Sequence, residues 1–392
     1  MATETAANEI PEPVAPAPFS LSQRGRAGME ILGSMQKCSS GPIRSYASEK
    51  FFANPVAAKL NEEHVADKKP AKEDLRRRLA KAKAICENDS IYRLERFVQR
   101  YVAEENYNRG IPAIEERRSM FEAFVNSEAT PAEGSTLDLE LDAEEPKYWS
   151  ATEWHLEPGG WEGYDLYAAV FAFAIGPKVF AHGGYAAVGV GDNIRQQRVD
   201  VARQLPKDSY ERVYEPGCGG FGTLNAVHTV FPDAELHGSD LSPSLLKGGF
   251  KMAGAMNVPV HLSRRDSTQT GEADDSYDGV ITYALHHEMP PKVNRAIFEE
   301  MFRILKPGGD IVISDPPPFR AVNMFHAVLL DWDTDHREEP FFTATGETVL
   351  EDVLEEVGFE AAEAYSIGEQ GSYPWVTRAR KPLDSKPAHV AA

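Results

Sequence analysis

The feature that most constrains the fold is the segment 213–223, which reads VYEPGCGGFGT. Its apolar start predicts a buried strand, and the glycines that follow predict a sharp turn into a helix that opens at about Thr223. Glycine is required where the backbone turns sharply and lies against a ligand, because a Cβ has no room there. The helix presents free N–H groups and the positive end of its dipole to whatever lies over the turn. The segment therefore predicts a ligand-binding strand–turn–helix unit.

Glu215, the acid just before the first glycine, narrows the choice of ligand. A dinucleotide-dependent oxidoreductase must place a pyrophosphate over this turn, and a carboxylate there would repel it. A cationic or zwitterionic ligand would be attracted instead. S-adenosylmethionine carries a sulfonium and an amino acid and no phosphate, so the turn favours it over NAD.

Charge and cysteine usage exclude other classes. The formal net charge of -20 disfavours a nucleic-acid partner. The three cysteines are far apart and show no metal spacing, so neither a disulfide framework nor a metal site is predicted. The N-terminus lacks a signal-peptide pattern, and the longest apolar run, 166–175, is too short to span a bilayer. We expect a soluble cytoplasmic protein without membrane insertion.

The first half of the chain predicts a helical region. Residues 1–20 are rich in Ala, Pro and Glu and predict a disordered tail, and 382–392 a second flexible tail. Residues 21–145 predict a helical N-terminal domain, with helices from Lys72, from Ser90 and from Ala113 to Asn126, and a linker over 130–145. Apolar stripes such as Leu75 and Leu79, or Leu94 and Phe97, are expected in its core. Two roles are open for this domain: holding a lid over a site, or forming a homodimer.

An aromatic-rich bridge, 146–205, separates the two halves. It gathers Trp154, Trp161 and Tyr164 around a Pro-Gly-Gly turn. A satellite core is one interpretation. The other is a lid whose rigid aromatic rings contact substrate or cofactor.

The second half, 206–381, alternates strands and helices and predicts an α/β, Rossmann-like fold. No helix separates the last two strands, so they form an antiparallel hairpin at the end of a mostly parallel seven-stranded sheet. The expected strands are 212–216, 235–240, 259–262, 278–284, 310–315, 359–366 and 373–380, and the expected helices are 222–230, 242–255, 292–304 and 345–357.

Four motifs in order carry a family resemblance. They are Glu215-x-Gly217-x-Gly219, the second-strand acid Asp240 followed by Ser242-Pro243, Asp266 with the acidic approach to the fourth strand, and Leu305-Lys-Pro-Gly-Gly309. Together they resemble a class I S-adenosylmethionine-dependent methyltransferase, of the small-molecule branch that includes quinone-biosynthesis enzymes. The family usually has a further glycine where this chain has Phe221.

The resemblance implies S-adenosylmethionine as cofactor and assigns its contacts. Glu215, Gly217 and Gly219 would meet the methionine moiety. Asp240 would bind ribose, because an acid that closes the second strand can accept both ribose hydroxyls. In the resembled family the third acid contacts adenine, and this position is Asp266 here. Their neighbours Leu241 and Ser267 complete the predicted cofactor site.

The methyl acceptor should lie over the carboxyl ends of the strands. His286, His287 and Glu288 directly follow the fourth strand, and a histidine there can act as base near neutral pH. His336, in the acidic segment 331–340 with Trp332, is a second base candidate. The predicted catalytic residues are thus His286, His287 and His336, and the predicted substrate and lid residues are Trp154, Trp161, Tyr164, Glu288 and Trp332.

The run Asp315-Pro-Pro-Pro-Phe319 is similar to a motif of nucleic-acid amino-methyltransferases, but it ends the fifth strand and not the fourth. We therefore expect a small-molecule acceptor, with O-, C-, N- or S-methylation left open. The alternative is a catalytically silent S-adenosylmethionine-binding scaffold.

Overall fold

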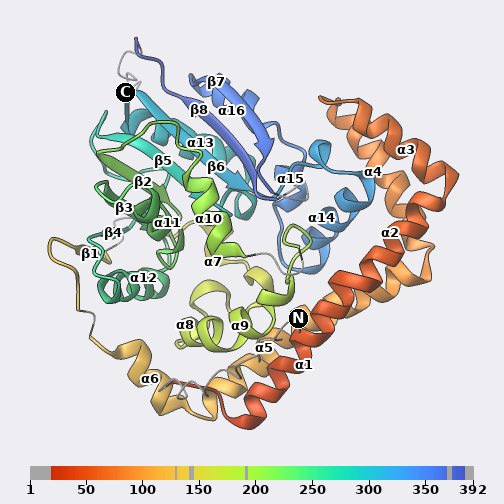
Figure 1. The fold of residues 1–392 in the computed structure, drawn as a ribbon, viewed down its shortest axis with the longest axis horizontal. Coiled ribbons are helices and arrows are strands. Elements are labelled where there is room, and N and C mark those ends of the chain that lie inside the picture. Colours follow the sequence, from red (N-terminus) through yellow and green to blue (C-terminus); the bar gives the residue numbers. More distant parts are fainter. Residues whose placement is uncertain (1–18, 129, 141–144, 190–192, 369–372, 385–392) are drawn as a thin grey trace, which may run out of the picture.

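The centre of the molecule is a mixed eight-stranded sheet (Figure 1). The computed structural model describes residues 19–128, 130–140, 145–189, 193–368 and 373–384. The strand order is β1-β4-β3-β2-β5-β6-β8-β7, and all neighbours are parallel except β8, which runs antiparallel to both β6 and β7. The strands are β1 (Thr136–Asp138), β2 (Arg212–Pro216), β3 (Glu235–Asp240), β4 (His261–Arg264), β5 (Tyr277–Tyr283), β6 (Leu305–Asp315), β7 (Glu360–Ser366) and β8 (Trp375–Arg380).

The predicted fold class is confirmed, with one addition. The terminal antiparallel hairpin is β7–β8, as expected. The eighth strand, β1, lies inside the segment 130–145 that the sequence predicts as a linker, and that prediction is wrong for these three residues. Three residues between turn-forming neighbours carry too little alternation to mark a strand, and β1 forms only by pairing with the edge of β4.

Helices cover one face of the sheet fully and the other face in part. The first face packs against α10 (Ile194–Ala202), α11 (Gly222–Val230) and α12 (Pro243–Ala255), and the second against α13 (Pro291–Ile304) and α16 (Leu350–Val357). α12 begins at Pro243 because the Ser242 side chain accepts a hydrogen bond from the Leu245 amide. Between β4 and β5 the chain crosses without a helix, so the second face is uncovered near β3 and β4.

The N-terminal helices curve along one side and beneath the sheet half, as Figure 1 shows. They are α1 (Gln23–Cys38), α2 (Arg44–Ala53), α3 (Pro55–Ala66), α4 (Lys72–Glu87), α5 (Ser90–Glu115) and α6 (Arg118–Asn126), with one wider turn, Ser39–Ile43, after α1. Of these, α3 and α4 pack against α14 (Met324–His336), which follows β6 and in turn packs against α15 (Phe342–Gly346). The helix predicted from Ala113 begins only at Arg118, because α5 continues through Pro112.

The predicted apolar stripe of α5 is only partly in the core. Leu75 and Leu79 of α4 are buried as expected, but Phe97 is 68% exposed. The buried side of α5 instead carries Glu95 and Gln99. Arg44 Nε lies 3.0 Å from Glu95 Oε1, and Arg337 donates to Gln99 Oε1 at 2.7 Å, so matched polar groups replace the expected apolar contacts.

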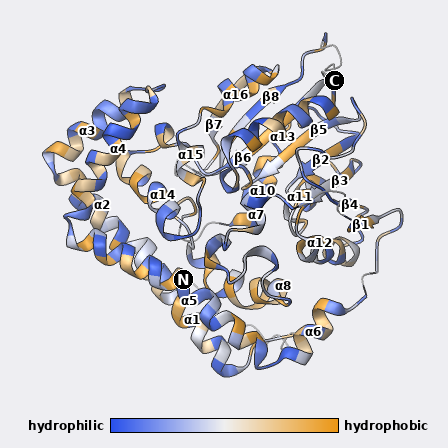
Figure 2. Cartoon of the chain, turned by 180° about the vertical axis from the view of Figure 1, so that it is seen from behind, coloured by the Kyte–Doolittle hydropathy of each residue, from blue (hydrophilic) through white to orange (hydrophobic). Residues whose placement is uncertain are grey.

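Residues 145–189, called the middle segment below, lie between the sheet and the α1–α5 pair (Figure 1). This segment contains α7 (Lys147–Ser150), α8 (Tyr167–Ala169) and α9 (Gly176–Lys178), joined by short turns. Its residues Tyr167, Val170 and Ile175 share a core with Met29 of α1 and Val102 of α5. The N-terminal helices alternate hydrophobic and hydrophilic residues around their circumference in Figure 2. Within the described ranges, no helix combines the length and apolarity that crossing a bilayer requires.

Candidate functional site

The site lies where the strand order reverses. The chain runs from β2 outward to β3 and β4 and then returns to β5 on the other side of β2. In open parallel sheets, ligands bind at the carboxyl ends of the strands at this point. The glycine-rich turn after β2 occupies it, with φ +64° at Gly217 and +49° at Gly219. A Cβ at Gly217 would come within 2.4 Å of Leu285 Cδ1, so a larger residue would have to push that side chain aside in addition to adopting a left-handed backbone. Among the described residues nothing lies within 4 Å of a Cβ at Gly219.

Phe221 occupies the position where the resembled family usually has glycine. Its φ is +74°, and it immediately precedes the first residue of α11. The left-handed backbone is therefore kept at this position, although the residue is not glycine. Its side chain is fully buried.

Glu215 is buried at the end of β2 with an unused acceptor. Its Oε2 has no hydrogen-bond partner within the described part of the chain. Burial raises the pKa of Glu215 to about 8, against the opposing effect of Thr223 and Arg198. A buried carboxyl group with one unpartnered oxygen, on the strand that leads into the glycine-rich turn, fits a ligand that brings a positive charge.

Asp240, at the end of β3, connects the turn to the next helix. One carboxylate oxygen accepts from the Gly219 amide at 2.9 Å and the other from the Ser242 amide at 2.8 Å. Burial raises the pKa of Asp240. Each oxygen keeps a second lone pair for a ligand hydroxyl. Ser242 is the residue that caps α12, so the Asp240 carboxylate is not needed as a cap and can bind a ligand over the turn.

The remaining predicted cofactor residues lie around the ends of β3 and β4. Asp266 Oδ1 accepts from the Thr268 amide at 2.9 Å and from its hydroxyl at 2.8 Å, which shapes the loop after β4. Leu241 offers its carbonyl to Arg264 at 2.9 Å, and Ser267 is half-buried.

Tyr148 joins these groups from the middle segment. Burial raises its pKa, and so do the negative charges of Asp266, Glu288 and Asp240. The charges of all three acids thus act on this tyrosine, whose ring meets Phe341 edge-on at 6.4 Å.

The two histidines after β5 have different surroundings. The ring of His286 is fully buried, with Nε2 3.1 Å from Thr282 Oγ1 and Nδ1 2.7 Å from Asn294 Oδ1. Both ring nitrogens thus face protein partners, which leaves His286 no atom for an acceptor. This geometry argues against His286 as the base that the sequence predicts.

His287 is charged in this arrangement. Its Nδ1 lies 2.8 Å from Asp315 Oδ1, at the end of β6, and both side chains are buried. Burial opposes the charge, but Asp315, Glu339 and Glu288 outweigh it and raise the pKa of His287 to about 10. A histidine that is already protonated at neutral pH cannot accept a proton, so this ring acts as a buried cation.

Glu288 and Glu339 share the imidazole of His155. His155 Nε2 lies 2.9 Å from Glu339 Oε1 and 3.7 Å from Glu288 Oε1. Burial opposes the charge of His155, but the two carboxylates raise its pKa. Burial raises the pKa of Glu288 to about 7, while the closer contact with His155 keeps the pKa of Glu339 low despite its burial. Of these groups, Glu288 is the one whose protonation changes near neutral pH.

The middle segment reaches over this cluster. His155 adopts φ +57°, an uncommon backbone for a residue other than glycine, and its ring meets Trp161 edge-on at 5.1 Å. Glu162 Oε1 accepts from the Ser244 amide at 3.2 Å and its hydroxyl at 2.8 Å, and also from Ser242 Oγ. These contacts at the start of α12, where the helix dipole favours a carboxylate, connect the segment to the end of β3.

The other predicted lid residues lie farther out. Trp154 is fully buried and donates to the Trp149 carbonyl at 3.2 Å, which is a packing role. The Tyr164 hydroxyl donates to Glu115 Oε1 at 2.6 Å, on the side of the segment that faces α5.

The segment 331–340 contributes through a residue other than the predicted ones. The ring of His336 lies 4.4 Å from that of Trp332 in a tilted arrangement, and the His336 carbonyl accepts from Arg100 of α5. Trp332 lies 4.7 Å from the Arg96 guanidinium. The pair thus packs against α5, and Glu339 is the member of the segment that reaches His155.

Sequence reasoning missed His155, Asp315, Glu339, Glu162 and Tyr148. Their partners lie far away in the chain, so no local spacing marks them. A weaker signal existed, since 331–340 and the end of the fifth strand are rich in acids beside the expected pocket.

Comparison with known proteins agrees with these motifs. Residues 213–309 match a family model described as a methyltransferase domain. The chain is 30% identical over 165 residues to the arsenite methyltransferase of Halobacterium salinarum, covering 39% of this chain and 38% of the relative. It is 29% identical over 141 residues to phosphoethanolamine N-methyltransferase 1 of Triticum aestivum, covering 35% and 26%.

Among solved structures, phosphoethanolamine N-methyltransferase 2 of Haemonchus contortus, in complex with phosphomonomethylethanolamine and S-adenosylhomocysteine, superposes with a TM-score of 0.40 at 15% identity. The match covers 48% of this chain and 52% of that chain. The chain spans well under half the length of the curated relatives it matches. The matched segment, residues 213–309, contains the glycine-rich turn, Asp240 and Asp266, so the predicted cofactor residues fall within a region that is similar to a methyltransferase domain. The narrower quinone-biosynthesis branch stays a prediction.

Proposed function

We propose that this chain is an S-adenosylmethionine-dependent methyltransferase that acts on a small-molecule acceptor held beneath the middle segment. The observation that carries the proposal is the position of that segment over the strand ends. Glu162 bonds to the start of α12, and His155 bonds to Glu339 beside Glu288. A small acceptor needs such an enclosure, because positioning fails when it can tumble in water.

The cofactor would lie over the glycine-rich turn. When bound, S-adenosylmethionine supplies a methyl group on a good leaving group. The unpartnered Oε2 of Glu215 would face the cationic part of the ligand, and Asp240 would accept from ribose hydroxyls. Tyr148, which the charges of Asp240 and Asp266 reach, would close the adenosine side.

Glu288 is the residue that we assign to proton removal. A general base works best when its pKa is near the working pH, and within the cluster of His155, His287, Glu288 and Glu339 it is Glu288 that meets that condition. His287, held charged by Asp315, would orient the acceptor or stabilise negative charge on it. This replaces the histidine base expected from the sequence.

Support for a small acceptor comes from the relatives, which are named for arsenite and phosphoethanolamine. The N-terminal helices would hold the lid in place, since Tyr107 of α5 is buried near Glu157 and Tyr167 of the middle segment. A homodimer through these helices, a cytoplasmic location and the absence of a nucleic-acid partner stay predictions.

The test uses the full chain with S-adenosylmethionine labelled on its methyl group and fractions of a small-molecule extract. We expect transfer of label to one fraction by the wild type and by His228→Gln, a control on α11. Glu288→Gln should lose transfer while still binding S-adenosylhomocysteine. Binding of S-adenosylhomocysteine without transfer to any fraction would favour the scaffold alternative, and full activity of Glu288→Gln would refute its role as base.

A further inference from the structure

The uncovered part of the sheet carries a row of polar side chains. Thr136 of β1 pairs in register with His261 of β4, which pairs with His237 of β3, which pairs with Tyr214 of β2. Residues in register on neighbouring strands share a face. They line an open cavity of about 460 Å³, which exists because no helix follows β4 to cover this face.

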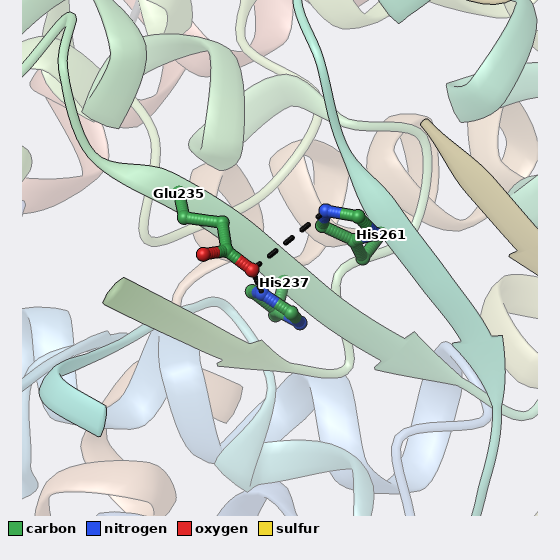
Figure 3. Close-up of side chains that lie close together, drawn as sticks. All are labelled: Glu235, His237 and His261. Atoms are coloured by element: carbon green, nitrogen blue, oxygen red, sulfur yellow. Dashed lines mark hydrogen bonds and ion pairs between the residues drawn. The ribbon is translucent and has the colours of Figure 1, made fainter. Parts of the chain in front are cut away.

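His237 and His261 both lie against the carboxylate of Glu235, as Figure 3 shows. Glu235 lies two residues before His237 on β3, so both point to the same face. Glu235 Oε1 is 2.6 Å from His237 Nε2 and 3.8 Å from His261 Nε2, and the two rings stack at 4.6 Å. All three potential ligand atoms lie within 4.8 Å of one another.

The hydrogen bonding around His237 is in conflict. Its Nε2 faces the Glu235 carboxylate at 2.6 Å, which requires a proton on that nitrogen. The same atom lies 3.1 Å from Arg212 Nη2, which can only donate and therefore requires a lone pair. One ring nitrogen cannot satisfy both.

His261 is already oriented as a ligand. Its Nδ1 lies 2.9 Å from Thr136 Oγ1. If the hydroxyl accepts from Nδ1–H, the lone pair of Nε2 points toward Glu235. A hydrogen bond to the second ring nitrogen is what orients most metal-binding histidines in proteins.

We propose that Glu235, His237 and His261 form a zinc site with a water as the fourth ligand. Two imidazoles and a carboxylate suit Zn²⁺ better than Mg²⁺ or Ca²⁺, which prefer oxygen ligands. Tetrahedral ligands at about 2.1 Å from zinc lie roughly 3.4 Å apart. The observed 2.6 Å and 3.8 Å separations bracket that spacing, so small side-chain rotations suffice. Zinc accepts electron pairs from all three atoms, which removes the conflict at His237.

Zinc would displace Arg212 from the two ligands that it contacts on β3, His237 Nε2 at 3.1 Å and Glu235 Oε1 at 3.5 Å. Its guanidinium also stacks on Tyr277 at 4.6 Å and donates to the Ser276 carbonyl at 3.2 Å, and both contacts can remain. The ion would join β3 to β4 and, through Thr136, hold the edge strand β1. It is separate from the methyl-transfer site, since Asp240 lies three residues further along β3, about 10 Å away. Its role would therefore be structural.

The experiment measures zinc binding to the full chain without a polyhistidine tag. After treatment with a chelator, we expect one Zn²⁺ per chain with a dissociation constant in the micromolar range or tighter, by competition with a chromophoric chelator. Glu235→Gln and His261→Gln should each weaken binding by at least about tenfold, and Thr136→Val by about tenfold through the loss of orientation. His228→Gln, on α11, is the matched histidine control and should bind as the wild type does.

Glu235→Gln separates loss of zinc binding from loss of folding, because this side chain is 48% exposed and can change without disturbing the core. Co²⁺ gives a second readout, because tetrahedral coordination produces intense visible absorption that Glu235→Gln and His261→Gln should reduce. Absence of stoichiometric zinc in the wild type, or equal affinity in Glu235→Gln and His261→Gln, would overturn the proposal.

Discussion

The free energy of unfolding should fall as the pH rises from 6 to 10, and replacing Asp315 by Asn should remove much of that fall. Asp315 Oδ1 lies 2.8 Å from His287 Nδ1, and both side chains are buried. Asp315 is the partner that contributes most to keeping His287 charged. Without it, burial favours the neutral ring.

The sign and size follow from the pKa of His287, which folding raises from 6.5 to about 10. A group whose pKa rises on folding stabilises the folded state fully below its unfolded pKa. That contribution is lost as the pH rises through the folded pKa. The full shift corresponds to roughly 5 kcal/mol. Because Glu339 and Glu288 remain in the variant, we expect the change in unfolding free energy between pH 6 and pH 10 to shrink by roughly 2–4 kcal/mol.

The assay is urea unfolding followed by tryptophan fluorescence at fixed pH values from 6 to 10. Asp352→Asn is the matched control, because its carboxylate pairs with Lys69 at the exposed surface. The control should follow the wild type closely, since such pairs contribute little. The same pH dependence in Asp315→Asn as in the wild type would refute the charged state of His287.

Four further outcomes test the site. Asp240→Ala should weaken S-adenosylhomocysteine binding by about 1–3 kcal/mol in calorimetry, because ligand hydroxyls lose their partner, and unchanged affinity would contradict the assignment. Glu288→Gln should lower turnover by about 100-fold or more with cofactor affinity nearly unchanged, and the wild-type rate should rise as the pH passes the raised pKa of Glu288. Glu162→Ala, like Trp161→Ala, should reduce turnover more than cofactor binding, since it frees the segment from α12; equal losses in both would argue against a lid. His286→Gln should lower the free energy of unfolding by about 1–3 kcal/mol and leave the pH–rate profile unchanged, because the ring binds only protein partners. A shifted profile would indicate that His286 takes part in catalysis after all.

The sequence was sufficient for the features that depend on neighbouring residues. β2, β3 and α11 have the bounds that periodicity predicts, and the glycine-rich turn lies where the family resemblance places it. Local patterns determine these elements because a buried strand or helix face repeats every few residues. The acids Glu215 and Asp240 could be identified for the same reason, since each ends a predicted strand.

The tertiary structure decided what depends on distant partners. β1 exists only because β4 offers an edge, and the zinc ligands Glu235 and His261 meet only because β3 and β4 are neighbours in register. The sequence predicted a histidine base, yet folding places Asp315 against His287 and keeps that ring charged. A protonation state depends on burial and on charges within a few ångströms, and the order of residues along the chain does not contain those distances.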